Sequence, residues 1–267
     1  MSQTQQHTKI DFLPLSGGGE IARLRFNRPE QANAFSSQMM TEISHHLKHL
    51  KTRENLRALV ISGEGKHFSA GADLAWMQAS AKLGLAENTK DASKLKDMFE
   101  SIVTLNTPKI GVTQGAAYGG AVGLLACCDF VIAHNDARFC LSEAKLGLLP
   151  AVIAPYLLRK MRYGALKRLA LTSQVFTAQE ALDIGLVEIV TDDLEPRLYR
   201  ELNALLACGP DAQIAINQLF ESLRQMGFQQ GQETVEAIAK ARVSSEGQAG
   251  LASFFAKTEP PWLRRLD

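Results

Sequence analysis

Two glycine-rich loops are the parts of this sequence best suited to chemistry, although the glycine turn of the second holds no acid, base or nucleophile. SAGADLAWM covers residues 69–77, and YGGAVGLL covers residues 118–125. Each loop leads into a segment that we predict to be helical, and helix N-termini present unpaired N–H groups with partial positive charge. If both loops point at one place, their N–H groups would form an oxyanion hole without side chains. The same glycines could instead serve only tight turns and close packing, and the residues alone leave both interpretations open.

Three familiar site motifs are absent around these loops. The glycines of the second loop do not follow the G-x-G-x-x-G spacing of a dinucleotide site. A P-loop would need lysine followed by serine or threonine, where Ala121 and Val122 stand. The segment HFSAG lacks the first glycine of a G-x-S-x-G nucleophile elbow, because His67 occupies that position. Nucleotide binding and serine hydrolysis are therefore disfavoured.

Composition excludes several classes of protein. The chain has 267 residues, of which 46% are hydrophobic and 21% charged, with a formal net charge of +1. Such a chain forms one large domain or two with a sizeable core, and it has no excess charge to favour nucleic acid or an anionic membrane as a partner. Its first ten residues lack an apolar signal core, and no apolar run approaches the length of a membrane helix. We expect a soluble, cytoplasmic protein.

Cysteines and histidines give no sign of a metal site. No cysteine belongs to a C-x-x-C pair, so we expect Cys127, Cys128, Cys140 and Cys208 to be small buried hydrophobes. His45, His46 and His49 have a spacing that could bind a metal, but they lie on the polar side of an amphipathic segment without a nearby carboxylate. We interpret this cluster as a solvated face.

The order of elements along the chain predicts an α/β fold. Residues ~8–26 should form two strands joined by SGGGE, followed by a helix capped by Ser36 or Ser37. Continuous apolar runs in LRALVISG, PKIGVTQG and DFVIAHN indicate buried strands, and ARFCLSE a shorter one. Residues ~80–92 are polar and alanine-rich, which suggests a mobile surface segment. From about residue 150 the pattern becomes helical, so we expect an α/β core with a helical C-terminal region.

Several separated segments resemble one family. HFSAGADL, GAAYGGAVGLLACCDFVIA and ARFCLSEAKLGLLP are similar to signature segments of the crotonase superfamily, the enoyl-CoA hydratases and isomerases. RPEQANAFS resembles the first CoA-binding loop of that family, and TAQEALDIGLV a later helix. The resemblance implies a spiral of ββα repeats over residues 1–200. It also implies a helical region over 201–267 that is used in forming a homotrimer or a dimer of trimers, and an acyl-CoA thioester substrate with no separate cofactor or metal.

The same resemblance assigns residues to roles. The backbone N–H groups of Ala72 and Gly120 would form the oxyanion hole for the thioester oxygen. Two-acid hydratases carry one catalytic glutamate at the position of Gly123 here, and the second matches Glu143 in CLSEAKLG. A single glutamate suits either hydration or the transfer of a proton from C2 to C4. The expected contacts to CoA are Asn33, Ala34, Ala70, Asp73, Leu74 and, near the C-terminus, Lys257.

Finer similarity favours one branch of the family. SAGADLAWMQ, Gly123 and FCLSEAKLGLLPAVIAPYLLRKM look most like the methylglutaconyl-CoA and carboxygeranoyl-CoA hydratases of leucine and isoprenoid breakdown. We therefore expect hydration of a branched enoyl-CoA, with isomerisation as the alternative. A non-catalytic, RNA-binding role is disfavoured by the balanced charge and the retained Glu143. The expected acyl-pocket residues are Val152, Ile153 and Tyr156, and the cations available for a second carboxylate are Lys145, Arg159 and Lys160.

Overall fold

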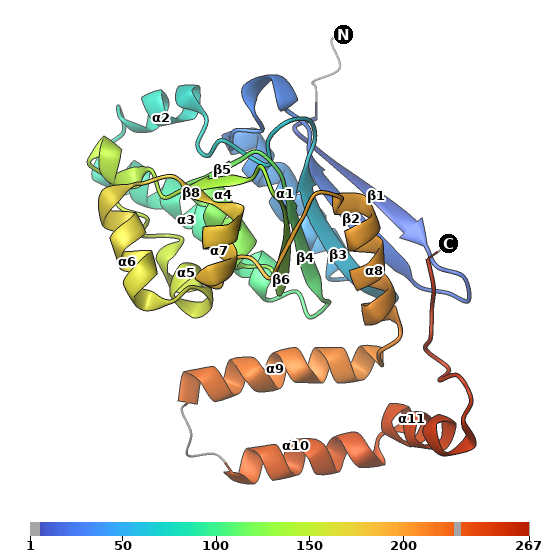
Figure 1. The fold of residues 1–267 in the computed structure, drawn as a ribbon. Coiled ribbons are helices and arrows are strands. Elements are labelled where there is room, and N and C mark those ends of the chain that lie inside the picture. The colour runs from blue at the N-terminus through green and yellow to red at the C-terminus, as the bar shows by residue number, and fades with distance from the viewer. Residues whose placement is uncertain (1–5, 227–230, 267) are drawn as a thin grey trace.

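A six-stranded sheet forms the centre of the computed structural model, which describes residues 6–226 and 231–266 (Figure 1). The first two strands pair antiparallel through a glycine turn, as predicted, and every later neighbour is parallel. In spatial order the strands are β1 (Thr8–Pro14), β2 (Glu20–Phe26), β3 (Leu56–Gly63), β4 (Lys109–Thr113), β6 (Phe130–His134) and β9 (Ile189–Thr191).

A second, three-stranded sheet lies beside the first and carries the turns of interest. It consists of β5 (Ala116–Tyr118), β7 (Arg138–Cys140) and β8 (Phe176–Thr177). Successive strands alternate between the sheets, since β4 and β6 belong to the large one while β5 and β7, which follow them, belong to the small one. This is the expected repetition of two strands and a helix.

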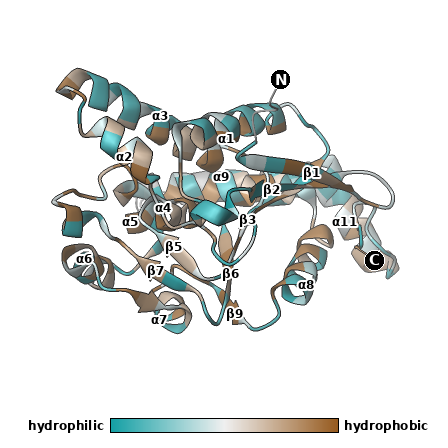
Figure 2. Ribbon diagram, turned by 90° about the horizontal axis from the view of Figure 1, so that it is seen from above, coloured by the Kyte–Doolittle hydropathy of each residue, from teal (hydrophilic) through white to brown (hydrophobic). Residues whose placement is uncertain are grey.

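Helices cover the two faces of the large sheet unequally. Helices α1 (Ser37–Leu50) and α3 (Leu85–Val103) pack together on one side, and α8 (Leu194–Leu206) lies on the other (Figure 2). Met39, Ile43, Leu47 and Leu50 of α1 are buried, and Ser36 caps the helix by accepting from the Met39 N–H, as predicted. The remaining core helices are α2 (Leu74–Ser80), α4 (Gly120–Ala126), α5 (Ala154–Lys160), α6 (Tyr163–Thr172) and α7 (Ala178–Asp183), with 3-10 turns η1 (Pro29–Gln31) and η2 (Glu143–Leu146).

The predicted surface segment over residues ~80–92 is exposed, but most of it is helical. Helix α3 already begins at Leu85, and the Glu87 carboxylate accepts from the Gly84 N–H at its start. The far end of α3 buries Met98 and Phe99 in the core. A polar first half therefore becomes helical because it is capped and continuous with a packed second half.

The C-terminal helices form an arm below the core (Figure 1). The arm comprises α9 (Pro210–Met226), α10 (Gly231–Val243) and α11 (Ser245–Ala256). The predicted boundary at residue 200 falls inside α8, whose Leu198 and Leu202 are buried against the large sheet. After the arm the chain returns to the core, where the Arg264 Nε donates to the Gly18 carbonyl. No helix among the described residues has the length and apolar character needed to cross a membrane.

Cysteines and histidines partly depart from the sequence expectations. Three cysteines are buried as expected, but Cys208 is exposed. His46 is half-buried and hydrogen-bonded to the Thr8 hydroxyl, which donates to Glu42 one turn before His46. The expectation of a fully solvated histidine face without a carboxylate is therefore wrong for His46. Within residues 6–226 and 231–266, no group of three histidine, cysteine or acidic side chains is placed to share a metal ion.

Candidate active site

The two glycine-rich loops lie side by side and are joined by backbone hydrogen bonds. The Ser69 N–H donates to the Ala116 carbonyl at 3.0 Å, and the Tyr118 N–H donates to the Ser69 carbonyl at 3.0 Å. Ser69 thereby extends the small sheet next to β5. The chain leaving β3 and the chain leaving β5 consequently reach their glycines in fixed register.

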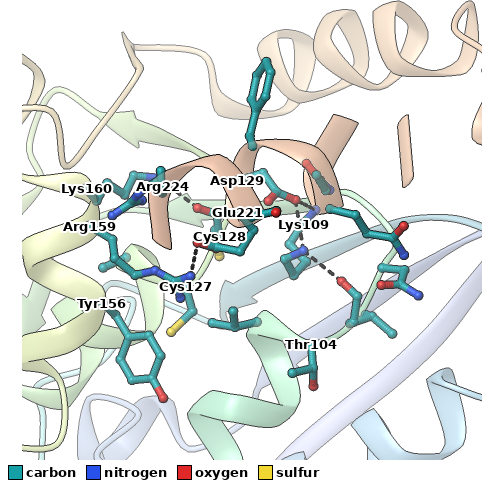
Figure 3. A pocket seen from close by; sticks show the side chains of 18 of the residues that line it. Thr104, Lys109, Cys127, Cys128, Asp129, Tyr156, Arg159, Lys160, Glu221 and Arg224 are labelled. Atoms are coloured by element: carbon teal, nitrogen blue, oxygen red, sulfur yellow. Dashed lines mark hydrogen bonds and ion pairs between the residues drawn. The ribbon is translucent and has the colours of Figure 1, made fainter. Parts of the chain in front are cut away.

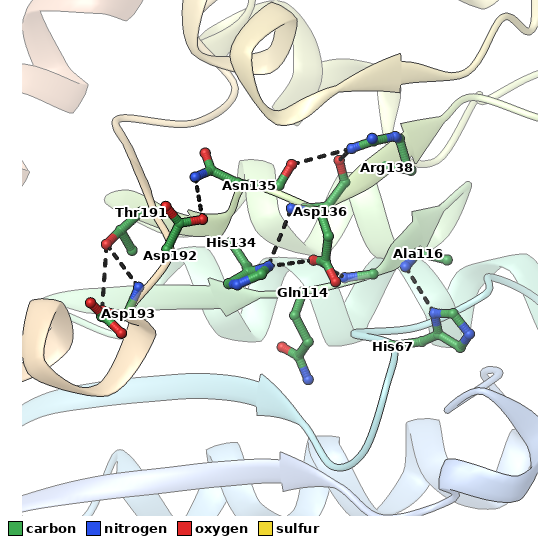
Figure 4. Close-up of polar contacts among 12 residues, drawn as sticks. His67, Gln114, Ala116, His134, Asn135, Asp136, Arg138, Thr191, Asp192 and Asp193 are labelled. Carbon is green, nitrogen blue, oxygen red and sulfur yellow. Dashed lines mark hydrogen bonds and ion pairs between the residues drawn. The ribbon is translucent and has the colours of Figure 1, made fainter.

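A histidine side chain adds a further link between these two segments (Figure 4). His67 Nδ1 accepts the Ala116 N–H at 3.0 Å. Gly115, with a φ of 56°, allows this approach, since a Cβ there would lie 2.1 Å from the Lys66 carbonyl oxygen and 2.6 Å from His67 Nδ1. The Gly115 N–H donates to Asp136 Oδ1 at 3.1 Å. The glycine that begins the second motif therefore serves loop packing.

Phe35 and Gly71 bring the two loop ends together. The Phe35 N–H donates to the Gly71 carbonyl at 2.7 Å, and the Phe35 carbonyl accepts from the Asp73 N–H at 3.0 Å. The Phe35 ring also lies 3.4 Å from where a Cβ on Gly120 would be. A Cβ on Gly71, whose φ is 96°, would lie 2.9 Å from the Tyr118 carbonyl oxygen, so only glycine permits this contact.

Two N–H groups at this junction are left available. In the part of the chain that the structure describes, neither the Ala72 N–H nor the Gly120 N–H donates to a protein acceptor. The adjacent Gly119 N–H is used instead, donating to the Cys140 carbonyl at 2.8 Å. A pair of unpaired backbone donors on adjoining loops is the arrangement that an oxyanion hole requires.

Glu143 reaches the same junction from the other strand of the small sheet. Tyr118 pairs with Cys140, and three residues later the chain enters η2 at Glu143. Its Oε1 lies 3.2 Å from where a Cβ on Gly119 would be. Its Oε2 is buried and has no hydrogen-bond partner among the described residues. Burial raises the pKa of the Glu143 carboxyl above its ordinary value, against a smaller opposing effect of a backbone hydrogen bond.

The surroundings of Gly123, where two-acid hydratases carry their other glutamate, are apolar. A Cβ on Gly123 would lie 2.2 Å from Ile153 Cγ2 and 2.6 Å from Ile153 Cβ. Ile153 is buried at the start of α5, which packs along α4. The isoleucine therefore fills the position that an acidic side chain on Gly123 would need.

Two of the expected CoA contacts use their side chains inside the protein. Asn33 is fully buried, accepts from the Arg28 N–H, and donates to the carbonyls of Glu64 and His67. Asp73 accepts from Arg28 Nη2 at 2.9 Å and caps α2 through the Ala75 N–H at 2.9 Å. These side chains hold the loops in shape, so any contact they make to CoA would come from the backbone.

The other expected CoA contacts range from exposed residues at the loops to one that lies far from them. Leu74 is 73% exposed at the start of α2, and Ala70 is exposed although its N–H already donates to the Ala32 carbonyl. Ala34 is buried and its carbonyl accepts from Arg28. Lys257 follows α11, on the opposite side of the molecule from α2 in both ribbon views (Figures 1 and 2). A single chain therefore does not bring Lys257 to the loops.

The expected acyl-pocket residues lie just before α5 and in its first turn. Val152 is half-buried, and Tyr156 is buried with its ring 5.5 Å from that of Phe99. Tyr156 also lines a cavity of about 900 Å³ between α9 and the core (Figure 3). This cavity is not lined by Ala72, Gly120 or Glu143. It begins one turn of α5 beyond Ile153.

Of the three expected cations, two line that cavity. Arg159 forms an ion pair with Glu221 of α9. Lys160 donates to the Cys128 carbonyl at 2.9 Å and pairs with Glu188 at 3.3 Å (Figure 3). Lys145 is exposed on η2 and does not line the cavity.

Sequence reasoning missed three residues that build this site. None of the three belongs to a chemical motif, because they hold the loops in place. They are Arg28, Phe35 and His67. The partner of Arg28 is Asp73, 45 residues away, and Phe35 meets Gly71 and Gly120, so the local sequence carries no signal for either role.

The chain is similar to known proteins over nearly its whole length, and the matches point to one family. The family described as enoyl-CoA hydratase/isomerase matches residues 17–265. A Thermus thermophilus protein that is described as an enoyl-CoA hydratase is 32% identical over 248 residues, which are 91% of this chain and 97% of that protein. The solved structure of an enoyl-CoA hydratase from Shewanella pealeana is 39% identical, with a TM-score of 0.88 and 94% of each chain covered. An enoyl-CoA hydratase/isomerase (crotonase) from Legionella pneumophila is 36% identical, with a TM-score of 0.90, covering 97% of this chain and 100% of that one.

Proposed function

The chain belongs to the enoyl-CoA hydratase/isomerase family, and we propose that it adds water to an α,β-unsaturated acyl-CoA. The observation that carries the proposal is the meeting of two unpaired N–H groups, on Ala72 and Gly120, with the carboxyl of Glu143 at one turn. Coenzyme A is part of this substrate, and the proposed reaction uses no separate cofactor.

The proposed steps balance with one carboxylate. Ionised Glu143 takes a proton from water as the water oxygen bonds to C3. The electron pair of the C2–C3 double bond shifts to form a C1–C2 double bond, and the carbonyl pair moves to the thioester oxygen. The Ala72 and Gly120 N–H groups stabilise the resulting enolate. Protonated Glu143 then returns a proton to C2, so that the net change is one added water. The raised pKa of Glu143 suits a group that must both accept and return a proton.

For the acyl group we propose a branched chain, of the methylglutaconyl type, that ends in a second carboxylate. The cavity beyond Ile153 lies apart from the junction of the two loops, and it offers a second carboxylate two cations, Arg159 and Lys160, next to Tyr156. Both cations are already paired with acids of the chain, so a substrate carboxylate would compete with Glu221 or Glu188. Arg159 is the better partner, since a guanidinium can hold two carboxylates at once.

Isomerisation is the competing function, and the same single glutamate favours it equally well. Incubation in oxygen-18 water separates the two. A hydratase converts methylglutaconyl-CoA or crotonyl-CoA to a labelled hydroxyacyl-CoA detected by mass spectrometry. An unlabelled product with a moved double bond, formed from a β,γ-enoyl-CoA, would replace our proposal with the isomerase.

We also propose that the protein is a homotrimer or a dimer of trimers, assembled through the C-terminal arm. The arm exposes large apolar side chains, which monomers rarely leave in contact with water as a group. Lys257, remote from the loops of its own chain, could then reach the CoA phosphates of a neighbour. Examples of these exposed side chains are Phe220, Val235, Ile238, Val243, Phe254 and Phe255.

A further inference from the structure

A second polar side chain stands beside Glu143 at the turn that carries the unpaired N–H groups. Among the three heavy atoms nearest to where a Cβ on Gly119 would lie, two belong to Glu143 and the third is Ser142 Oγ, at 3.8 Å. The Glu143 Oε1 is 3.2 Å from that same point. The serine hydroxyl and the glutamate carboxyl thus flank one face of the turn.

The Ser142 hydroxyl does not stabilise the local fold through a hydrogen bond. It precedes η2, a position where serine commonly caps a helix, yet its side chain makes no capping hydrogen bond. No other hydrogen bond of this hydroxyl is formed within residues 6–226 and 231–266. Ser142 is half-buried, while Leu141 before it is fully buried and fixes the backbone. The hydroxyl therefore lies beside the turn and is available for a hydrogen bond to a ligand.

Hydration needs such a group. A water held only by Glu143 can rotate about one hydrogen bond, whereas attack on C3 requires a defined direction. An acid on Gly123 is excluded by Ile153, which leaves that side of the site apolar. A hydroxyl offers one donor and two acceptors, so its oxygen can accept a hydrogen bond from the second O–H of the water.

We propose that Ser142 is a catalytic residue that holds the attacking water, together with Glu143, in this one-glutamate site. The water donates one hydrogen bond to Glu143 and the other to Ser142 Oγ. As its oxygen bonds to C3, only the proton on the Glu143 side is transferred, and Ser142 keeps its own proton throughout. This inference rests on the proposed hydration, because proton transfer without added water does not need Ser142.

The test compares two reactions of the same protein. Hydration of crotonyl-CoA is followed by oxygen-18 incorporation. Exchange of the C2 protons of butyryl-CoA in deuterium oxide is followed by mass spectrometry, and it uses Glu143 and the oxyanion hole but no attacking water. We expect Ser142→Ala to lower the hydration rate by about 10- to 100-fold, the range expected from losing one hydrogen bond to a reacting group. The exchange rate should stay within about threefold of the original. Ser142→Thr, which keeps the hydroxyl, should restore hydration.

Other outcomes overturn the proposal in distinguishable ways. Unchanged hydration by Ser142→Ala would show that the hydroxyl is not needed. Equal losses of hydration and exchange would show that Ser142 acts by shaping Glu143 rather than by holding water. If the original protein exchanges C2 protons and never hydrates, the proposed function itself fails, and the inference with it.

Discussion

Ile153 occupies the position that a side chain on Gly123 would need, with its Cγ2 only 2.2 Å from the site of a Cβ there. Gly123 belongs to α4 and Ile153 is the N-cap residue of α5, and the two helices pack along each other. Glycine and isoleucine are therefore complementary in volume, and together they leave Glu143 as the acid at this turn. A site with one glutamate depends on this pair.

Adding a methyl group at Gly123 should destabilise the protein. Gly123→Ala forces the new Cβ into Ile153, and overpacking of this kind costs about 1–3 kcal/mol in free energy of unfolding. Urea titration measures the loss. Gly164→Ala is the matched control, because a Cβ at that helical position meets nothing within 4 Å. Equal stability of the two alanine variants would contradict the packing.

The pH dependence of activity should reflect the burial of Glu143. Its pKa is raised above the ordinary 4.5 by desolvation, and the carboxylate must be ionised to accept a proton from water. As the pH falls, kcat/KM should therefore decline at a pH above 4.5 while the protein remains folded by circular dichroism. A decline that begins only below 4.5, or one that coincides with unfolding, would contradict the role of Glu143 as the base.

The elements were largely predictable because each depends on local pattern. The apolar face of α1 and the continuous run of β3 needed no tertiary information. The absence of an acid at Gly123 was also visible, but Ile153, thirty residues later, could not be identified as the side chain that fills the position. Such a contact depends on how α4 and α5 pack.

Polar residues near the site were harder to interpret. The family resemblance implies that Asn33 contacts CoA. In the structure, however, its side chain forms three hydrogen bonds within the protein. The reason is the left-handed backbone at Ala32 and Asn33, with φ of 47° and 53°, which turns the loop back on itself. A sequence pattern does not distinguish a side chain that binds a ligand from one that holds the loop around it.

The ion pair between Arg28 and Asp73 should position the oxyanion loop. Asp73→Ala removes both this pair and the cap of α2, so we expect a loss of about 1–2 kcal/mol in stability and at least about a tenfold loss of kcat/KM. Asp73→Asn keeps the capping oxygen and should be less damaging in both measurements. Asp97→Ala, which removes an exposed partner of Lys96, is the control and should change stability by less than about 0.5 kcal/mol. If Asp73→Ala behaves like that control, the ion pair has no positioning role.

Substrate choice tests the proposed acyl pocket. Replacing Arg159 by methionine should lower kcat/KM for methylglutaconyl-CoA at least about tenfold more than for crotonyl-CoA, because only the former carries a second carboxylate. Comparing two substrates of one variant cancels any general damage from leaving Glu221 unpaired. Lys145→Met, on the exposed turn, should leave the ratio unchanged. An unchanged ratio in Arg159→Met would remove Arg159 from the pocket.

The central claim is that Glu143 is the acid–base group of the site. The most direct measurement is the steady-state hydration rate of Glu143→Gln, with crotonyl-CoA and methylglutaconyl-CoA as substrates. We predict a fall in kcat of about 10²–10⁴-fold, the range for losing a general acid–base group, with little change in KM because glutamine has nearly the same shape. Full activity of the glutamine variant would contradict the one-glutamate mechanism.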